Sequence, residues 1–269
     1  MIIEKGKLCN MRFFRELKKY WGFAIYAAKS DLRAEVANSY LNWLWWILEP
    51  TSSMLIYTIV FGIVFKSTEL YFPIFVFIGI TVWDYFSRCI TSSVNLIRGN
   101  HHIITKVYIP KYILLIQRML VLAFKMLIGW GLVAVLMLIF RVPVGINMIY
   151  FIPTLVVFFV FCFACSLYFV HFGVYVSDLS NLLSIALNLM FYVTGIFYSI
   201  QKSFPQPWGY LLQRMNPIAH LIFCFRKALL YNERPSCIML GIWFAISLLL
   251  AAGGIHLIYK NENNYVKMI

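Results

Sequence analysis

The stretch SYLNWLWWILEPTSSMLIYTIVFGIVFK, residues 39–66, combines the length of a membrane span with residues that a simple anchor does not need. A helix that crosses a bilayer needs about 20 mostly apolar residues, and this stretch supplies them. It also carries Trp43, Trp45 and Trp46, followed by Glu49 and Pro50. Because an acid inside a span is costly in lipid, the stretch is predicted to line a path rather than only to anchor the chain.

The composition of the whole chain indicates an integral membrane protein. Of its 269 residues, 62% are hydrophobic and 12% are charged, whereas a soluble domain has about 25% charged residues. The formal net charge of +13 is interpreted through the placement of Lys and Arg beside the spans, not as nucleic-acid binding. The first 35 residues lack the compact apolar region of a cleavable signal peptide, so we expect the first span to target the chain.

Residues 1–38 are predicted to form a cytoplasmic amphipathic interface helix, and residues 39–269 a single transmembrane domain. Within 10–35, apolar and basic side chains alternate at helical spacing. Such a helix lies in the lipid headgroup region, and packing on a partner protein is an alternative that can hold at the same time. The apolar positions are Phe13, Phe14, Leu17, Trp21, Ile25 and Tyr26, and the basic ones are Arg12, Arg15, Lys18 and Lys19.

Six apolar segments are predicted to cross the membrane, which makes the fold class an all-α integral membrane protein. They lie at about residues 40–65, 72–94, 112–140, 148–176, 180–200 and 237–259. Lys and Arg are concentrated before the first span and between the second and third, so both termini are expected in the cytoplasm.

The connection between the last two predicted spans, residues 201–236, breaks this charge pattern. It places several Lys and Arg on the predicted outer side, yet it is too apolar for a free loop. Two short helices that re-enter the membrane from outside would explain both features, because backbone at membrane depth must be helical or covered by protein.

Charged residues inside the predicted spans suggest an internal ion pair. Asp84 and Lys125 are placed at similar depth, and Lys125 is predicted to pair with Asp84 or with Glu49, with Arg88 as a competitor. Leaving any of these groups in lipid would cost several kcal/mol. A pair that fixes helix packing is favoured over a proton relay.

The sequence offers no recognisable catalytic, metal or nucleotide motif. It has no GxxxxGK[ST] loop, so ATP hydrolysis is expected on a separate subunit, and this chain is expected to bind no cofactor. The five histidines are scattered, and none has metal-ligand spacing to a Cys or a carboxylate. Cys162 and Cys165 lie in an apolar run and are interpreted as packing residues. Without a nucleophile signature, the chain is not predicted to be an enzyme.

Four motifs occur in order over nearly the whole chain. They are YLNWLWWILEP with YTIVFGIVF, FPIFVFIGITVWDYF running into NLIRGNHHIITKVYIPKYIL, VSDLSNLL with TGIFY, and MNPIAHLIFCFRKALL. Together they resemble the membrane subunit of ABC-2 type exporters, which move polysaccharides or teichoic acids across the bacterial inner membrane. Departures from the family pattern, such as Asn42, Glu49 and Ser177, bear on substrate detail rather than on the class.

This resemblance implies a homodimer that assembles with two copies of a separate ABC ATPase. The second connection would then be a coupling helix set into the ATPase, because its apolar residues are not needed in a solvated turn. The alternative is a solvated turn whose basic residues only set the orientation. The coupling residues would be Asn95, Leu96, Ile97, Arg98, His101, His102, Ile103 and Ile104.

The resemblance also implies that spans one and five face each other across the dimer axis and line a glycan path. Aromatic faces hold the C–H faces of sugars weakly, which suits a sliding polymer, although Trp and Tyr also form interfacial belts. The path residues would be Trp43, Trp46, Glu49, Tyr57, Phe61, Phe191, Tyr192, Phe197 and Tyr198.

The glycan is expected on a lipid carrier joined through phosphate or pyrophosphate. Arg12, Lys29 and Arg33, near the predicted cytoplasmic entrance, are natural partners for that anion. Attraction to anionic lipid explains the same residues equally well.

The predicted function is therefore that of the permease subunit in an ATP-driven exporter of a lipid-linked surface glycan, with wall teichoic acid, O-antigen and capsular polysaccharide as possible cargoes. The expected location is the bacterial cytoplasmic membrane, with several membrane passes. One alternative is an ABC-2 exporter of a small lipid or drug, which is expected to lack the aromatic first span. Another is a polytopic enzyme acting on lipid-linked sugars, for which the ten acids are too dispersed.

Overall fold

The computed structural model describes residues 2–37, 42–66 and 69–267. The predicted domain boundary at 38–39 and the first two residues of the predicted span 40–65 lie outside the described residues.

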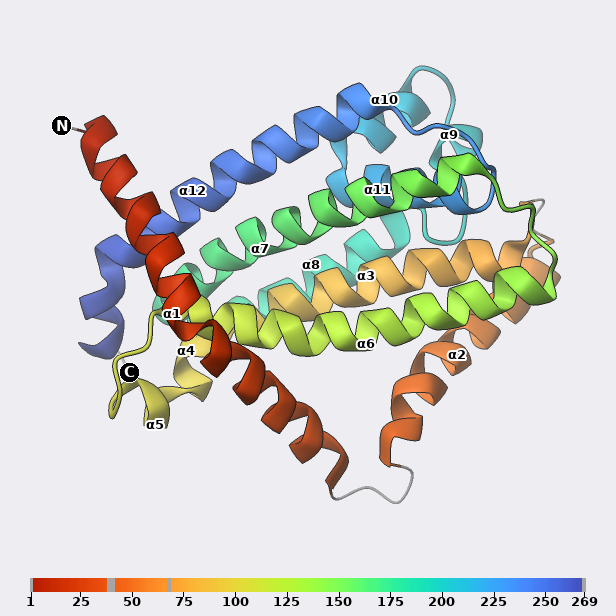
Figure 1. The fold of residues 1–269 in the computed structure, drawn as a ribbon. Helices are drawn as coiled ribbons and strands as arrows, with labels where there is room; N and C mark the ends of the chain where they lie inside the picture. The colour runs from red at the N-terminus through yellow and green to blue at the C-terminus, as the bar shows by residue number, and fades with distance from the viewer. Residues whose placement is uncertain (1, 38–41, 67–68, 268–269) are drawn as a thin grey trace.

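The described helices fall into a long and a short group. The long ones are α1 (Ile2–Ala37), α2 (Trp45–Tyr57) with its continuation η2 (Thr58–Val64), α3 (Phe72–Val94), α6 (Lys111–Ile139), α7 (Phe151–Tyr175) and α12 (Cys237–Lys267). The short ones are η1 (Asn42–Leu44), α4 (Leu96–Gly99), α5 (His101–Ile104), η3 (Ile146–Tyr150), α8 (Leu179–Val193), α9 (Ile200–Ser203), α10 (Trp208–Met215) and α11 (Pro217–Leu229). Helices α3, α6, α7, α8 and α12 run side by side as a bundle, α1 crosses them at one end, and α2 diverges from them toward one side (Figure 1).

Helix α3 forms the centre of the bundle. It begins with Pro73 in its first turn, where the missing N–H costs nothing. Its sequence is mostly apolar, with Asp84 and Arg88 as its only charged residues, which is typical of a helix covered on most sides. It packs against α2, α6, α7, α8 and α11, and 78% of its most apolar stretch is buried.

The segment α2–η2, which follows η1, is almost uncovered in the isolated chain. Only 6% of its most apolar stretch is buried, and it rests on α3 and α6 along one side. Pro50 lies inside α2, and the neighbouring Thr51 donates a hydrogen bond from Oγ1 to the Ile47 carbonyl at 2.6 Å. From Thr58 to Val64 the helix widens into a π-helix, a form that occurs often at functional sites.

The predicted all-α membrane fold is confirmed, but the count of six spanning helices is not. Among the described residues, five helices are long and apolar enough to cross a membrane: 45–64, 72–94, 111–139, 146–175 and 237–262. The predicted span at 180–200 is α8, whose 15 residues reach about 22 Å, whereas a bilayer core is about 30 Å thick. It stops because Gly195 adopts a φ of 74°, which favours glycine and turns the chain.

The chain nevertheless passes from one end of the bundle to the other between α7 and α12. At one end, Arg98 donates to the carbonyl of Val174 at 3.2 Å, beside the start of α8. At the other end, Lys202 of α9 pairs with Glu69 at 2.8 Å. The start of α1 and the end of α12 lie at the same end as α4 and α5 (Figure 1).

Two helices, α10 and α11, occupy much of the segment predicted to re-enter the membrane. Asn216 caps α11, since its side chain accepts hydrogen bonds from the backbone of Ile218 and Ala219 at 3.1 and 3.2 Å. Helix α11 is not a surface helix, because most of its residues are buried against α3, α7 and η3.

Candidate functional site

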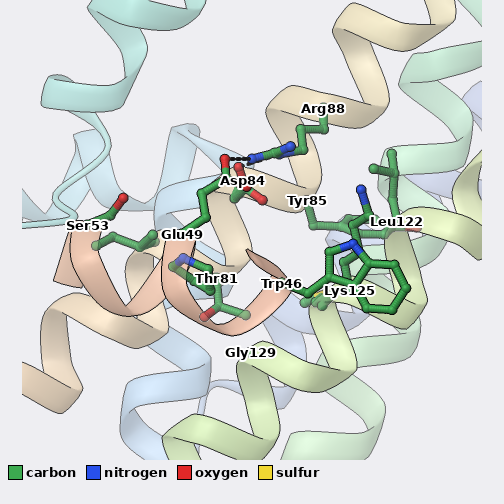
Figure 2. A pocket seen from close by; sticks show the side chains of 13 residues that line it. Trp46, Glu49, Ser53, Thr81, Asp84, Tyr85, Arg88, Leu122, Lys125 and Gly129 are labelled. Carbon is green, nitrogen blue, oxygen red and sulfur yellow. Dashed lines mark hydrogen bonds and ion pairs between the residues drawn. The ribbon is translucent and has the colours of Figure 1, made fainter. Parts of the chain in front are cut away.

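A charged recess lies between α2, α3 and α6, with Glu49, Asp84 and Arg88 at its centre (Figure 2). Arg88 Nη2 donates to Glu49 Oε1 at 2.5 Å, and Arg88 Nε donates to Asp84 Oδ1 at 2.7 Å. The cavity measures about 90 Å³ and is also lined by Trp46 and Lys125. One guanidinium thus bridges two carboxylates that come from neighbouring helices.

The predicted ion pair between Lys125 and Asp84 or Glu49 is wrong in its partners. Lys125 Nζ contacts Glu35 Oε2 at 2.6 Å, while Arg88 holds both Asp84 and Glu49. The reason is that the end of α1 lies over α6, which brings Glu35 within reach of Lys125. Asp84 and Lys125 still line the same recess.

An aromatic cluster joins α2–η2 to α8, and its members are Tyr57, Phe61, Phe191, Tyr192 and Phe197. The rings of Phe61 and Phe197 are stacked with centroids 4.3 Å apart, and Tyr57 lies 4.7 Å from Phe197. The first and fifth predicted spans therefore meet through these rings within one chain, where sequence analysis expected contact across a dimer axis.

The members of the cluster differ in burial, and so in what they can touch. Phe197 is only 3% exposed and fills the centre of the cluster, whereas Tyr192 is 56% exposed. Tyr198, half-buried beside the cluster, donates to the Tyr192 carbonyl at 3.0 Å. The predicted path residue Trp43 lies apart from the cluster, near the start of α2, and is 58% exposed.

The amphipathic helix α1 is attached to the bundle through a network centred on Glu16. Arg12 Nε, Tyr112 Oη and Tyr259 Oη donate to this carboxylate at 2.7, 2.7 and 2.8 Å. Burial raises the pKa of Glu16, but these hydrogen bonds outweigh it and leave the pKa below its usual value. Arg12 also donates to Tyr108 Oη at 2.7 Å.

This network alters the assignment of the residues predicted to bind an anionic headgroup. Arg12 is engaged by Glu16 and Tyr108 and serves to dock α1. Lys29 and Arg33 lie exposed on α1. Of the apolar positions predicted for this helix, Phe13 and Leu17 pack on the core, and the exposed ones are Phe14, Trp21, Ile25 and Tyr26.

The predicted coupling loop forms the two short helices α4 and α5, preceded by Asn95. Leu96, Ile97 and Ile104 are buried in their own chain, at 7%, 1% and 6% exposure. These three residues are therefore already covered by their own chain, and of the four apolar residues only Ile103 still needs a partner to cover it. Ile103 is 43% exposed. Other residues of this segment are exposed as well, namely Arg98, His102, Val107 and Tyr108, and His101 is half-buried.

The role of Arg226, which is 4% exposed in α11, was not predicted from the sequence. Its guanidinium donates to the carbonyl oxygens of Phe75, Gly195 and Ile196 at 2.7 to 3.2 Å. It thereby ties the start of α3 to the turn that carries Phe197 of the aromatic cluster. In the sequence Arg226 stood out only as one residue of the motif MNPIAHLIFCFRKALL, where Lys227 follows it directly.

The chain is similar to several permeases of known transport systems. It is 26% identical to the O-antigen export system permease protein RfbA of Myxococcus xanthus over 241 residues, which cover 89% of this chain and 92% of that protein. RfbA of Klebsiella pneumoniae is 22% identical over 240 residues, with the same coverage. The polysialic acid transport protein KpsM of Escherichia coli is 25% identical over 209 residues, which cover 74% of this chain and 78% of KpsM.

The family model described as ABC-2 type transporter matches residues 26–230. The matched region runs from α1 through α11 and includes the charged recess and the aromatic cluster. This multi-pass membrane protein therefore belongs to the ABC-2 type transporter family.

Proposed function

We propose that this chain is the permease subunit of an ATP-driven ABC transporter that exports a lipid-linked cell-surface glycan. The observation that carries the proposal is the uncovered segment α2–η2, which holds charged and aromatic side chains in a part of the chain that spans the membrane. Charges at that depth need water or protein rather than lipid around them. The names of the relatives, which concern O-antigen and polysialic acid, support a polysaccharide as the cargo.

A second copy of the chain would complete the path. Segment α2–η2 and helix α8, which share the aromatic cluster, both have exposed apolar residues that two copies could cover symmetrically. In α2–η2 these residues are Leu48, Leu55, Ile56, Ile59, Val60, Ile63 and Val64, and in α8 they are Leu182, Ile185 and Leu189.

The path would hold the glycan by many weak contacts. The exposed rings of Trp43 and Tyr192 offer flat apolar faces to sugar rings, and Glu49 offers a hydrogen-bond acceptor. A polymer that must slide needs contacts that are weak and repeated. The buried rings of the cluster, such as Phe197, would set the shape of the wall rather than touch the cargo.

A separate ATPase subunit would bind ATP and Mg²⁺ and act on the exposed part of α4 and α5. Ile103, His102 and the neighbouring Tyr108 form the surface available to it. Closure of an ATPase dimer would shift the population of permease states, which requires that the ATPase contacts differ between those states.

In this arrangement the end of the bundle that carries α1, α4 and α5 faces the cytoplasm of a bacterium, with both chain ends on that side. The concentration of Lys and Arg before α2 supports the orientation. Lys29 and Arg33 would meet the phosphate of the lipid carrier at the entrance. Helices α10 and α11 would re-enter the membrane from the outer side.

Depletion of the chain in its bacterial host tests this function. Surface glycan and intracellular lipid-linked glycan are measured together after depletion. We expect surface glycan to fall while the lipid-linked form accumulates inside, with recovery that needs an intact partner ATPase. Normal surface glycan in cells that lack the chain would overturn the proposal.

A further inference from the structure

The charged recess lies at mid-depth in the helices that surround it. Asp84 is at the middle of the 23-residue helix α3, and Lys125 is at the middle of the 29-residue helix α6. The side chains of Glu49, Asp84 and Arg88 are nonetheless 60%, 49% and 39% exposed in the isolated chain. Charged groups at this depth do not face acyl chains, so the recess must open on a space that holds water or cargo.

The recess keeps hydrogen-bonding capacity that its internal contacts do not use. Among the described residues, Arg88 engages Oε1 of Glu49 and Oδ1 of Asp84, and the second oxygen of each carboxylate has no protein donor. Ser53, one turn beyond Glu49, adds a hydroxyl to the lining. The recess therefore offers acceptors and donors close together.

The charge balance indicates the kind of ligand. Two carboxylates, Glu49 and Asp84, share one cation, Arg88, because Lys125, which also lines the recess, is paired with Glu35. A phosphate or a sugar carboxylate would lie against the two carboxylates and be repelled. Neutral hydroxyls have no such penalty, since carboxylates accept from them and a guanidinium donates to them.

Trp46, on the same helix as Glu49, adds an aromatic surface to the polar lining of the recess. It is half-buried, its ring lies edge-on to Phe124 with centroids 5.6 Å apart, and it lines the recess. An indole face beside paired carboxylates matches a sugar ring, which has an apolar face and a polar edge. The recess has a volume of 90 Å³, about that of three water molecules in the liquid. It can therefore hold the hydroxyl edge of one sugar ring while the rest of the glycan stays in the path.

The geometry points to a carbohydrate subsite in the recess of Trp46, Glu49, Asp84 and Arg88, which takes the hydroxyl edge of one neutral sugar of the passing glycan. The assignment rests on the proposed function and narrows it, because it favours a glycan rich in neutral sugars over a polyanion. Trp46 supplies the wall, the two carboxylates accept from neighbouring hydroxyls, and Arg88 holds both carboxylates in place.

Protection of an introduced cysteine tests the subsite. Ser53→Cys is placed in the full-length permease in membranes, and its modification by a water-soluble cationic thiosulfonate is followed by mass spectrometry. Rates are compared with and without maltotetraose, a neutral oligosaccharide, and with and without a sialic acid tetramer. We expect maltotetraose to slow the modification by about threefold or more and the anionic tetramer to have little effect.

The carboxylates are tested in the Ser53→Cys background. Glu49→Gln combined with Asp84→Asn should raise the maltotetraose concentration for half-protection by about tenfold, because two charged acceptors are lost. Glu233→Gln is the matched control, since Glu233 is also 60% exposed and also paired, with Lys227 at 3.0 Å, but lies outside the recess. It should leave protection unchanged. Where the double variant fails to fold, Asp84→Asn alone and Trp46→Leu give the same comparison.

Three results would overturn the subsite: no protection by maltotetraose, equal protection after loss of both carboxylates, or stronger protection by the sialic acid tetramer. The depletion experiment separates this from failure of the proposed function. If depletion abolishes surface glycan but maltotetraose does not protect Ser53→Cys, the subsite is refuted while the proposed export function stands.

Discussion

Two consecutive spans of this chain, α2–η2 and α3, have similar length and opposite surroundings. The apolar stretch of α3 is 78% buried, whereas that of α2–η2 is 6% buried. Helix α3 packs against α2, α6, α7, α8 and α11 and exposes only the side around Asp84 and Arg88, which faces the recess. In contrast, α2–η2 presents Glu49 and many aromatic and aliphatic side chains to its surroundings. The difference distinguishes a helix that mainly maintains the fold from one that, under the proposed function, is free to contact a second copy and the cargo.

The largest effect is expected where α3 is tied to α11. Arg226→Met leaves the carbonyl oxygens of Phe75, Gly195 and Ile196 without their donor, and each unpaired buried group costs about 1–3 kcal/mol. We expect almost no folded protein. The amount is measured as the area of the monodisperse peak in size-exclusion chromatography after detergent extraction and heating. Arg234→Met, on an exposed residue of the following loop, is the control and should behave as wild type. Normal yield of the Arg226 variant would show that the buried guanidinium is dispensable.

A smaller loss is expected at the contact between the end of α3 and α7. A Cβ on Gly173 would overlap the backbone of Val94, with its Cα only 2.7 Å away, so Gly173→Ala must push the two helices apart. We expect a loss on the order of 1–3 kcal/mol, typical of overpacking, seen as a lower melting temperature. Gly131→Ala, on a helical glycine with open space around it, should not lower it. Equal melting temperatures for both variants would contradict the packing.

On α2, a change is expected to affect assembly rather than folding. Ile56 is 58% exposed, and a polar residue there would weaken a symmetric interface twice, once from each copy. We expect Ile56→Asn to raise the dimer dissociation constant by roughly tenfold, measured by light scattering, with little change in melting temperature. Leu138→Asn on α6, at 75% exposure, should leave the dimer intact. A fully dimeric Ile56 variant would place the interface elsewhere.

The smallest effect is expected in the aromatic cluster. Phe61→Leu removes the ring stacked on Phe197 and keeps an apolar side chain, and such a contact is worth about 0.5–1.5 kcal/mol. We expect a moderate fall in glycan export with normal folding. Phe140→Leu, at a position 42% exposed at the end of α6 and away from the cluster, should export normally. Export that is unchanged in the Phe61 variant would mean that the cluster has no part in the path.

The sequence predicted the two spans with different success, for physical reasons. Helix α3 was placed at 72–94, as observed, because Pro73 opens a mostly apolar run that ends before Asn95. The partner of Lys125 could not be predicted, since Glu35 is distant in sequence and comes near only when α1 lies over α6. The π-helical segment η2 could not be predicted, because it leaves no distinct spacing of apolar residues in the sequence. The early end of α8 could not be predicted either, because it depends on the backbone conformation of Gly195.

In the recess and the cluster, residue types were predicted better than their partners. Glu49 and Trp46 stood out as costly or unusual in a span, and the structure places both beside the cavity. The bridging role of Arg88 and the buried role of Arg226 depend on contacts between helices, which a single sequence does not encode locally.

Photocrosslinking from two tryptophans tests most directly whether the recess side of α2 faces the glycan while the packed side of α3 does not. Trp46 of α2 lines the recess, and Trp83 of α3 is 7% exposed in the core. Each is replaced in turn by p-benzoylphenylalanine in cells that assemble the glycan, which are then irradiated, and glycan-bearing permease is detected by its shift in mass. Adducts from position 46 and none from position 83 are the predicted result. Adducts from position 83, or from neither position, would contradict it.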